Sequence, residues 1–397
     1  MLETRIAKEL AYISQAGLAR RITELYFVNP AQAQDRTGKT YLVLASNNYL
    51  GFTHAPEVIE AASRAALKFG TGSSGSRLTT GGTFIASELE KRLADFKHSE
   101  SALVFNTGYM TNLGVLYGLM QTGDVVFSDE LNHASIIDGC RISRCKVVVY
   151  KHNDMADLQR LLETEIVTGQ RFIVTDGVFS MDGDIADLPS LAVLKKQFNA
   201  CLIVDDAHGV GVIGNDGSGT ASHYGLTDVI DLQVGTLSKA LAAEGGYVAG
   251  KKILIDYLIN RSRPFIFSTA LAPATLAAAN AALLLLQTQG SKYLDSLRAN
   301  SRLMRRLLLE GGLNVVEGIT PIIPVVIGEA GLTMQFADRL KSKGILVSGI
   351  RPPTVPRGES RLRITVTAAH CEEQLRQAAQ IITALWQELK HGEKKEG

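Results

Sequence analysis

The sequence has 397 residues, of which 46% are hydrophobic and 20% charged, a composition typical of a globular enzyme with more than one lobe. Its 41 basic and 40 acidic side chains give a net charge of +1, so no strong field favours binding to nucleic acid or to an anionic membrane. The four cysteines are scattered without zinc-site spacing, so we expect no metal site and reduced thiols.

No segment of the sequence resembles a signal peptide or a membrane span. The first ten residues carry charges throughout, with no apolar run. The most apolar stretch, residues 270–286, is interrupted by Pro273 and Asn280, which favours a buried helix. We therefore expect a cytoplasmic protein.

Residues 1–50 are expected to form an N-terminal helix and arm. Residues 1–27 have helical spacing of apolar side chains. Turn-forming residues follow at Asn29-Pro30 and in 35–38, before the strand-like segment Tyr41–Leu44.

Residues 51–290 are expected to form a large α/β domain. Short apolar runs alternate with helical patterns such as Asp157–Glu165 and Leu188–Phe198. Continuous Val/Ile/Leu runs joined by helices predict a mostly parallel central sheet sandwiched between helices. The expected strands are Ala102–Phe105, Val125–Ser128, Val147–Tyr150, Phe172–Thr175, Leu202–Val204, Leu232–Val234 and Tyr247–Ala249.

Residues 291–397 are expected to form a smaller C-terminal α+β domain, and a long helix near 274–311 leads into it. Its expected strands are Ile322–Ile327, Ile345–Val347 and Arg361–Thr367, and its expected helices are Thr333–Ser342 and Glu372–Lys390.

Polar residues follow the buried strand Leu202–Val204 at its carboxyl end. Asp205 and Asp206 come first, and alternation along a strand places them on opposite faces, so only one can reach a given ligand. His208 lies three residues after Asp205. A carboxylate at this position could also cap a helix or bind a metal.

A single lysine, Lys239, follows the next apolar run, 229–234. It could be an ordinary solvated lysine, but the small residues around it suit a crowded pocket. A carboxylate that keeps a pyridine nitrogen protonated, together with a lysine that forms an imine, is what pyridoxal phosphate chemistry requires. Asp205 and Lys239 therefore predict this cofactor, with His208 placed to bind the ring hydroxyl.

Two further segments fit such a cofactor. Residues 103–112 predict a strand, a turn at Gly108 and Tyr109, and a helix whose first N–H groups could bind phosphate, although a plain strand–helix turn has the same pattern. Thr236 adds a hydroxyl beside Lys239. His133 could be an ordinary core histidine, but a flat imidazole could also stack on the cofactor ring.

A glycine pattern at Gly70–Gly75 matches the dinucleotide fingerprint G-x-G-x-x-G. That fingerprint works only directly after a strand and at the start of a helix, whereas residues 57–69 have helical composition. We therefore interpret the segment as a loop and exclude a nicotinamide or flavin site there.

Taken together, the motifs resemble the α-oxoamine synthase family of fold-type-I pyridoxal phosphate enzymes, with the aspartate aminotransferase-like fold. The resemblance extends nearly from end to end. Its segments are 46–51, 72–77, 129–135, 175–183, 204–209, 236–239, 351–356 and 361–365.

The resemblance implies a role for each matching residue. Lys239 would form the imine, and Asp205 would contact the ring nitrogen. His208 would contact the ring hydroxyl, and His133 would stack on the ring. The phosphate and ring would be held by Gly108, Tyr109, Ser180 and Thr236. In a homodimer, Ser268 and Thr269 would reach the phosphate of the partner subunit. Asn47 and Arg363 would bind the amino-acid carboxylate, and Arg20 (or Arg21 beside it) and Thr354 would line the acyl side. Many relatives have Asp where this chain has Asn48, which leaves Asn47 intact.

Within the family, segments 263–270 and 350–356 are most similar to members of biotin biosynthesis. Those acyltransferases join L-alanine to a pimeloyl thioester, carried by coenzyme A or acyl carrier protein, with loss of CO2. The alternatives are sister activities: glycine C-acetyltransferase, 5-aminolevulinate synthase and serine palmitoyltransferase. A non-catalytic cofactor-binding regulator would need a DNA-binding module, and the roughly fifty residues before the core motifs contain no basic helix-turn-helix pattern.

Overall fold

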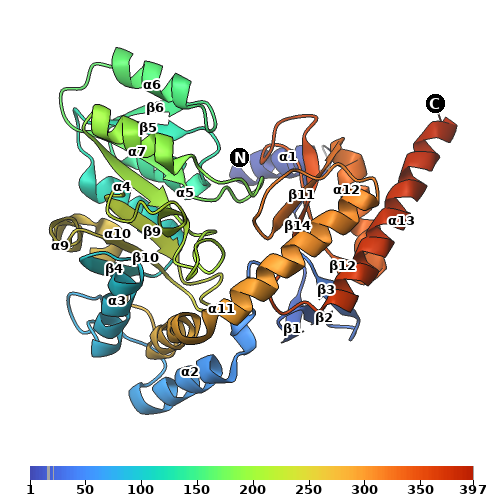
Figure 1. Ribbon diagram of the computed structural model, residues 1–397, viewed down its shortest axis with the longest axis horizontal. Helices are drawn as coiled ribbons and strands as arrows, with labels where there is room; N and C mark the ends of the chain where they lie inside the picture. Colours follow the sequence, from blue (N-terminus) through green and yellow to red (C-terminus); the bar gives the residue numbers. More distant parts are fainter. Residues whose placement is uncertain (16–17, 21, 397) are drawn as a thin grey trace.

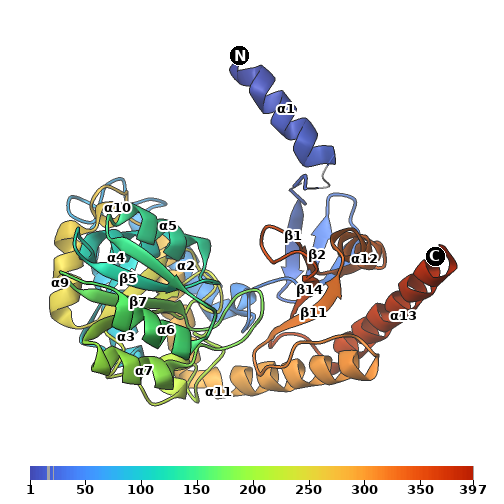
Figure 2. The same ribbon diagram turned by 90° about the horizontal axis from the view of Figure 1, so that it is seen from above.

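The computed structural model describes residues 1–15, 18–20 and 22–396. Two bodies share one long helix, α11 (Pro273–Glu310), which runs from the larger body into the smaller one (Figures 1 and 2). The helix has 38 residues, and buried side chains occur along most of its length, as expected for an element that packs in both bodies.

A seven-stranded sheet forms the centre of the larger body, in the order β4-β10-β9-β8-β7-β5-β6. Strand β10 alone runs opposite to the other six strands of this sheet, which confirms the predicted mostly parallel sheet. The strands are β4 (Ser101–Phe105), β5 (Val125–Asp129), β6 (Lys146–Tyr150), β7 (Arg171–Asp176), β8 (Ala200–Asp205), β9 (Leu232–Thr236) and β10 (Gly246–Gly250).

Helices cover both faces of this sheet, because both sides of its central strands are apolar. Val126 of β5 packs in one hydrophobic cluster with Val115 and Ile255, whereas its neighbours Val125 and Phe127 pack in another. The helices of this body are α2 (Pro56–Phe69), α3 (Phe84–Phe96), α4 (Gly108–Leu119), α5 (Ala134–Ile142), α6 (Met155–Thr164), α7 (Leu188–Gln197), α8 (Thr220–His223), α9 (Lys252–Arg261), α10 (Arg263–Ile266) and the 3-10 turn η1 (Phe52–His54).

The smaller body contains two sheets. A three-stranded antiparallel sheet has the order β11-β14-β13, and a four-stranded sheet has the order β1-β2-β3-β12. The parallel pairing of β3 with β12 joins the N-terminal arm to the C-terminal part of the chain. Their bounds are β1 (Leu25–Asn29), β2 (Gln32–Asp35), β3 (Thr40–Val43), β11 (Ile322–Gly328), β12 (Ile345–Leu346), β13 (Ser348–Ile350) and β14 (Ser360–Thr365), with helices α12 (Ala330–Ser342) and α13 (Glu372–Glu396).

The N-terminal helix is shorter than the predicted 1–27. Helix α1 (Leu2–Gln15) ends at Gln15, and β1 and β2 form an antiparallel hairpin around Pro30. The aromatic and β-branched run 26–28 favours a strand once a pairing partner is present, which the helical spacing alone did not indicate. The expected domain boundary at 290 falls inside α11 and stays a prediction.

Helix α1 extends away from the rest of the chain and has no buried residue (Figure 2). Over the described ranges, no helix combines the length and the apolar character needed to cross a membrane.

A buried ion pair fixes the loop that follows β8. Lys97, just after α3, donates from Nζ to Asp206 Oδ2 at 3.0 Å, and both side chains are at most 1% exposed. Asp206 also accepts from the backbone N–H and the hydroxyl of Thr220. The backbone approaches this carboxylate so closely that a Cβ added at Gly219 would lie 1.7 Å from Asp206 Oδ2. Asp206 and Lys97 therefore hold loop 206–220 against the sheet.

Replacing Lys97 with Met leaves the Asp206 carboxylate buried without its counter-ion. We expect this change to lower the free energy of unfolding by about 3–5 kcal/mol, the usual effect of removing one member of a buried pair. Lys91→Met, at an exposed position on α3, is the matched control. Urea unfolding curves of the two variants provide the measurement, and equal midpoints would contradict the assigned role.

A protonated histidine fastens a second loop. His152 Nδ1 lies 2.9 Å from Asp129 Oδ1, and Nε2 lies 2.8 Å from Asp184 Oδ2. Burial lowers the pKa of His152, but hydrogen bonds to the two carboxylates outweigh burial and raise the pKa to about 10. Asp129 ends β5 and Asp184 lies between β7 and α7. The imidazolium therefore ties the loop of residues 177–187 to the end of β5.

The raised pKa of His152 makes this contribution to stability pH-dependent. Since the folded pKa is about 10 and the ordinary value is 6.5, the stabilisation is complete below about pH 6.5 and is lost as the pH rises toward 10. We expect His152→Gln to reduce the loss of stability over that window, compared with the unmodified chain. Urea midpoints at about pH 6 and about pH 9 measure the difference. The exposed His223, changed to Gln, is the control; a pH dependence of His152→Gln identical to that of the control would contradict the ion pairs.

Candidate active site

Three neighbouring strands end at the same edge of the large sheet. Asp176 ends β7 and pairs in register with Asp205, which ends β8, and β9 ends beside them at Thr236. The carboxyl edge of a parallel sheet is where α/β proteins bind ligands. Lys239 follows three residues after Thr236, so the predicted lysine and acid are delivered by adjacent strands.

The carboxylate of Asp205 is held in one orientation. Oδ2 accepts from the Nδ2 of Asn112 at 2.6 Å, and Oδ1 accepts from the backbone N–H of Ala207 at 3.0 Å. Asn112 lies on α4 and also donates to the Ser135 hydroxyl at 2.8 Å. Asp206 points to the other side, toward Lys97, as strand alternation predicts.

Charges around Asp205 compensate one another. Burial lowers the pKa of Lys239, while the nearby carboxylates of Asp205 and Asp176 act to raise it. Burial and the charge of Asp205 raise the pKa of Asp176 well above its ordinary value. Burial therefore disfavours the charged form of both Lys239 and Asp176.

The charges at this sheet edge also act on two histidines, His133 and His208. Burial lowers the pKa of His133, and the charge of Lys239 adds to this while Asp205 opposes it. The His133 backbone N–H donates to Asp176 at 2.8 Å, and its ring caps α5 through Ser135. Burial, followed by the charges of Lys239 and Arg363, lowers the pKa of His208 well below its usual range. Both rings are therefore neutral near pH 7.

Arg363 brings the two bodies together at this site. It lies on β14, is 5% exposed, and donates from Nη2 to Asn47 Oδ1 at 3.2 Å and from Nε to the carbonyl of Ser180. Asn47 belongs to the N-terminal arm and Ser180 to loop 177–187 of the larger body. A guanidinium in this setting can bind a carboxylate through paired hydrogen bonds.

The predicted phosphate segment begins α4. Thr107 caps the helix by accepting from Met110 N–H at 3.0 Å, which leaves the N–H groups of Gly108 and Tyr109 without intrahelical acceptors. A Cβ at Gly108 would lie 3.4 Å from Thr236, so the hydroxyl of Thr236 faces the helix start closely. The Tyr109 ring lies edge-on to His133, with centroids 6.4 Å apart.

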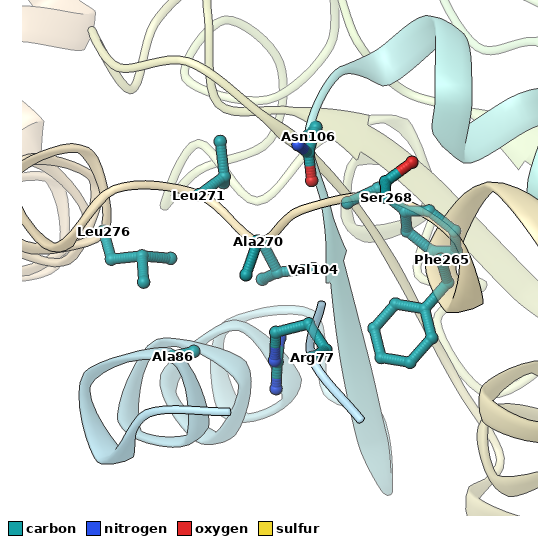
Figure 3. Close-up of a pocket in the computed structure, with 10 residues that line it drawn as sticks. Arg77, Ala86, Val104, Asn106, Phe265, Ser268, Ala270, Leu271 and Leu276 are labelled. Atoms are coloured by element: carbon teal, nitrogen blue, oxygen red, sulfur yellow. The ribbon is translucent and has the colours of Figure 1, made fainter. Parts of the chain in front are cut away.

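Among the described residues, four of the predicted site residues form no hydrogen bond with this cluster. Arg20 and Thr354 are exposed, and Arg21 lies outside the described residues. Ser268 lines a small cavity with Asn106 and Arg77 (Figure 3). Thr269 is exposed beside it and accepts from Asn106 through its carbonyl. The roles assigned to all these residues from the sequence stay predictions.

Sequence reasoning missed three residues of the cluster: Asp176, Asn112 and Tyr49. Asp176 had a usable signal, because it ends an apolar strand in the same way as Asp205. Asn112 lies one helical turn after Gly108, which places it on the same face of α4. Tyr49 had no local signal, because its hydroxyl meets His208 across 159 positions of sequence.

Comparisons with known proteins identify the family of the chain. The sequence model of the aminotransferase class I and II family matches residues 39–382. The 8-amino-7-oxononanoate synthase of Lysinibacillus sphaericus is 47% identical over 374 residues, which cover 94% of this chain and 96% of that protein.

Solved structures with the same fold include a serine palmitoyltransferase from S. paucimobilis with a bound PLP–myriocin aldimine. It has a TM-score of 0.91 at 31% identity and covers 97% of both chains. The 8-amino-7-oxononanoate synthase of Francisella tularensis has a TM-score of 0.76 at 30% identity and covers 89% of this chain and 98% of its own. The family resemblance and the fold class predicted from sequence are thus confirmed, and the chain belongs to the aminotransferase class I and II family.

Proposed function

We propose that this protein is a pyridoxal phosphate-dependent acyltransferase of biotin biosynthesis. It condenses L-alanine with a pimeloyl thioester, carried by coenzyme A or acyl carrier protein, to give 8-amino-7-oxononanoate, CO2 and free thiol. Similarity over nearly the full length to a synthase of that name, at 47% identity, supports the reaction. The observation that carries the proposal is the meeting of Lys239, Asp205 and Arg363 at one sheet edge, since these groups suit a cofactor aldehyde, a pyridinium and a substrate carboxylate.

The residues present fit pyridoxal phosphate. Asp205 offers a fixed carboxylate, Lys239 a buried amine, and the start of α4 offers free N–H groups beside the Thr236 hydroxyl. When bound, the cofactor supplies an electron sink in conjugation with the substrate amino group.

Asp205 and Lys239 carry the proton chemistry in this proposal. Asp205 keeps the cofactor's ring nitrogen protonated, and Asn112 and the Ala207 N–H keep the carboxylate aimed. Lys239 would hold the cofactor through its Nζ. The same Nζ would accept the proton from the alanine Cα, a task suited to an amine whose pKa is lowered by burial.

Binding and orientation fall to the surrounding residues. Arg363 and Asn47 bind the alanine carboxylate, and His133 stacks on the cofactor ring. Gly108, Tyr109 and Ser180 hold the phosphate and ring. Exposed Arg20 and Thr354 line the approach of the long acyl thioester.

The proposal extends to a cytoplasmic homodimer. Ser268 lines a small cavity and Thr269 accepts from Asn106, and the family resemblance implies that both would reach the phosphate of a second copy. All four cysteines are free thiols, which supports a reducing compartment.

Replacing Lys239 with Ala removes the covalent attachment point of the cofactor. We expect the variant to bind pyridoxal phosphate without covalent retention after borohydride reduction, and to lose about 10²–10⁴-fold in kcat because the proton acceptor is gone. Intact mass after reduction gives the readout. Lys251→Ala, at an exposed position, should retain the full mass increment; a persistent increment in Lys239→Ala would assign the attachment to another residue.

The assay that tests the function measures thiol release from pimeloyl-CoA by the purified protein with pyridoxal phosphate, with alanine, glycine or serine as the partner. We expect alanine-dependent release with one CO2 per thiol. Release with glycine or serine alone would assign a sister activity on the same fold. No release with any of the three would refute the proposal for this acyl donor, and the same comparison with pimeloyl carrier protein then decides between donors.

A further inference from the structure

Tyr49 and His208 form a buried hydrogen bond beside the cluster. The Tyr49 hydroxyl lies 2.6 Å from His208 Nδ1, and Tyr49 is 0% exposed. The Tyr49 backbone is fixed on both sides, because its N–H donates to Asn47 and its carbonyl accepts from Ala368 N–H, both at 2.8 Å. The phenol therefore has little freedom to turn away from the imidazole.

The hydrogen bond allows two arrangements of protons. Burial raises the pKa of Tyr49 to about 12, and burial lowers that of His208, so both groups are neutral and each carries one proton. Either the phenol donates to Nδ1, or Nδ1–H donates to the phenol. In the second arrangement the phenol proton would go to Asn47 Oδ1, which is 3.4 Å away.

The neighbourhood of Tyr49 favours donation from the phenol. The distance of 3.4 Å to Asn47 is long for an O–H donor, whereas 2.6 Å to His208 is short. Asn47 Oδ1 already accepts from Arg363 at 3.2 Å. The positive charge of Arg363 also acts on the Tyr49 hydroxyl. The phenol proton is therefore assigned to the short contact with His208 Nδ1.

We propose that Tyr49 is a positioning residue that fixes His208 as the tautomer with its proton on Nε2. The Nε2–H group is then a permanent donor, suited to an anionic oxygen such as the ring oxygen of pyridoxal phosphate. This last assignment rests on the proposed function, whereas the tautomer does not. Arg363, Asn47, Tyr49 and His208 also form one continuous line of polar contacts between the proposed carboxylate site and the proposed ring site.

The tautomer can be read directly by ¹⁵N NMR of the full chain with ring-labelled histidines, before any cofactor is added. The sequence has eight histidines, and His208 is assigned by the signal that disappears in His208→Gln. We expect an unprotonated Nδ1 and a protonated Nε2. A protonated Nδ1 in the unmodified protein would overturn the proposal by itself, whether or not any variant folds and whether or not thiol release is observed.

Tyr49→Phe removes the hydroxyl and keeps the ring. We expect the His208 signals to shift to a mixture of tautomers. In the cofactor-loaded protein we expect the pH midpoint of the bound cofactor's absorbance to move by about one unit, because His208 no longer presents a fixed donor. Tyr150→Phe is the matched control, since Tyr150 is 1% exposed and its hydroxyl has no partner among the described residues. Unchanged His208 signals in Tyr49→Phe would also overturn the proposal. A changed tautomer with an unchanged absorbance midpoint would overturn only the contact with the cofactor ring.

Discussion

The structure depends on two adjacent acids that leave strand β8 in opposite directions. Asp206 turns to Lys97 and Thr220, where it is completely buried and organises the loop behind the site. Asp205 turns to Asn112 and the cluster around Lys239. Strand alternation thus directs one carboxylate into the buried ion pair and its neighbour toward Asn112 and Lys239. The two cannot exchange roles, because each has hydrogen-bond donors only on its own side.

Positive and negative charges compensate one another around Lys239. Asp176 and Asp205 end neighbouring strands, and both face the amine of Lys239. Arg363 brings a further positive charge from the smaller body and is held there by Asn47 and the Ser180 carbonyl. Loop 177–187, which carries Ser180, is in turn tied to β5 through His152. The ion pairs of His152 with Asp129 and Asp184 therefore support the polar cluster at the sheet edge without belonging to it.

Much of the larger body could be predicted from the sequence, because apolar runs and strand-end acids are local signals. Asp205 and Lys239 were predicted for that reason. Strand β8 ends at Asp205, and strand β9 ends at Thr236, shortly before Lys239. The hairpin β1–β2 could not be predicted, since its pairing competes with a helical spacing that is equally visible in the sequence. Tyr49 and Asn112 were not predicted, because each contacts a residue that is distant in the sequence. Tyr49 meets His208 and Asn112 meets Asp205 only after folding.

Helix α11 connects the two bodies without a linker. Its 38 residues span about 57 Å at 1.5 Å per residue, and it packs against α2 and α3 in one body and against α13 in the other. A flexible, protease-sensitive joint is therefore absent from residues 273–310, and a cut there would break helical hydrogen bonds and expose buried leucines. The two bodies cannot be produced as separate fragments by dividing the chain within this helix without disrupting the packing of both.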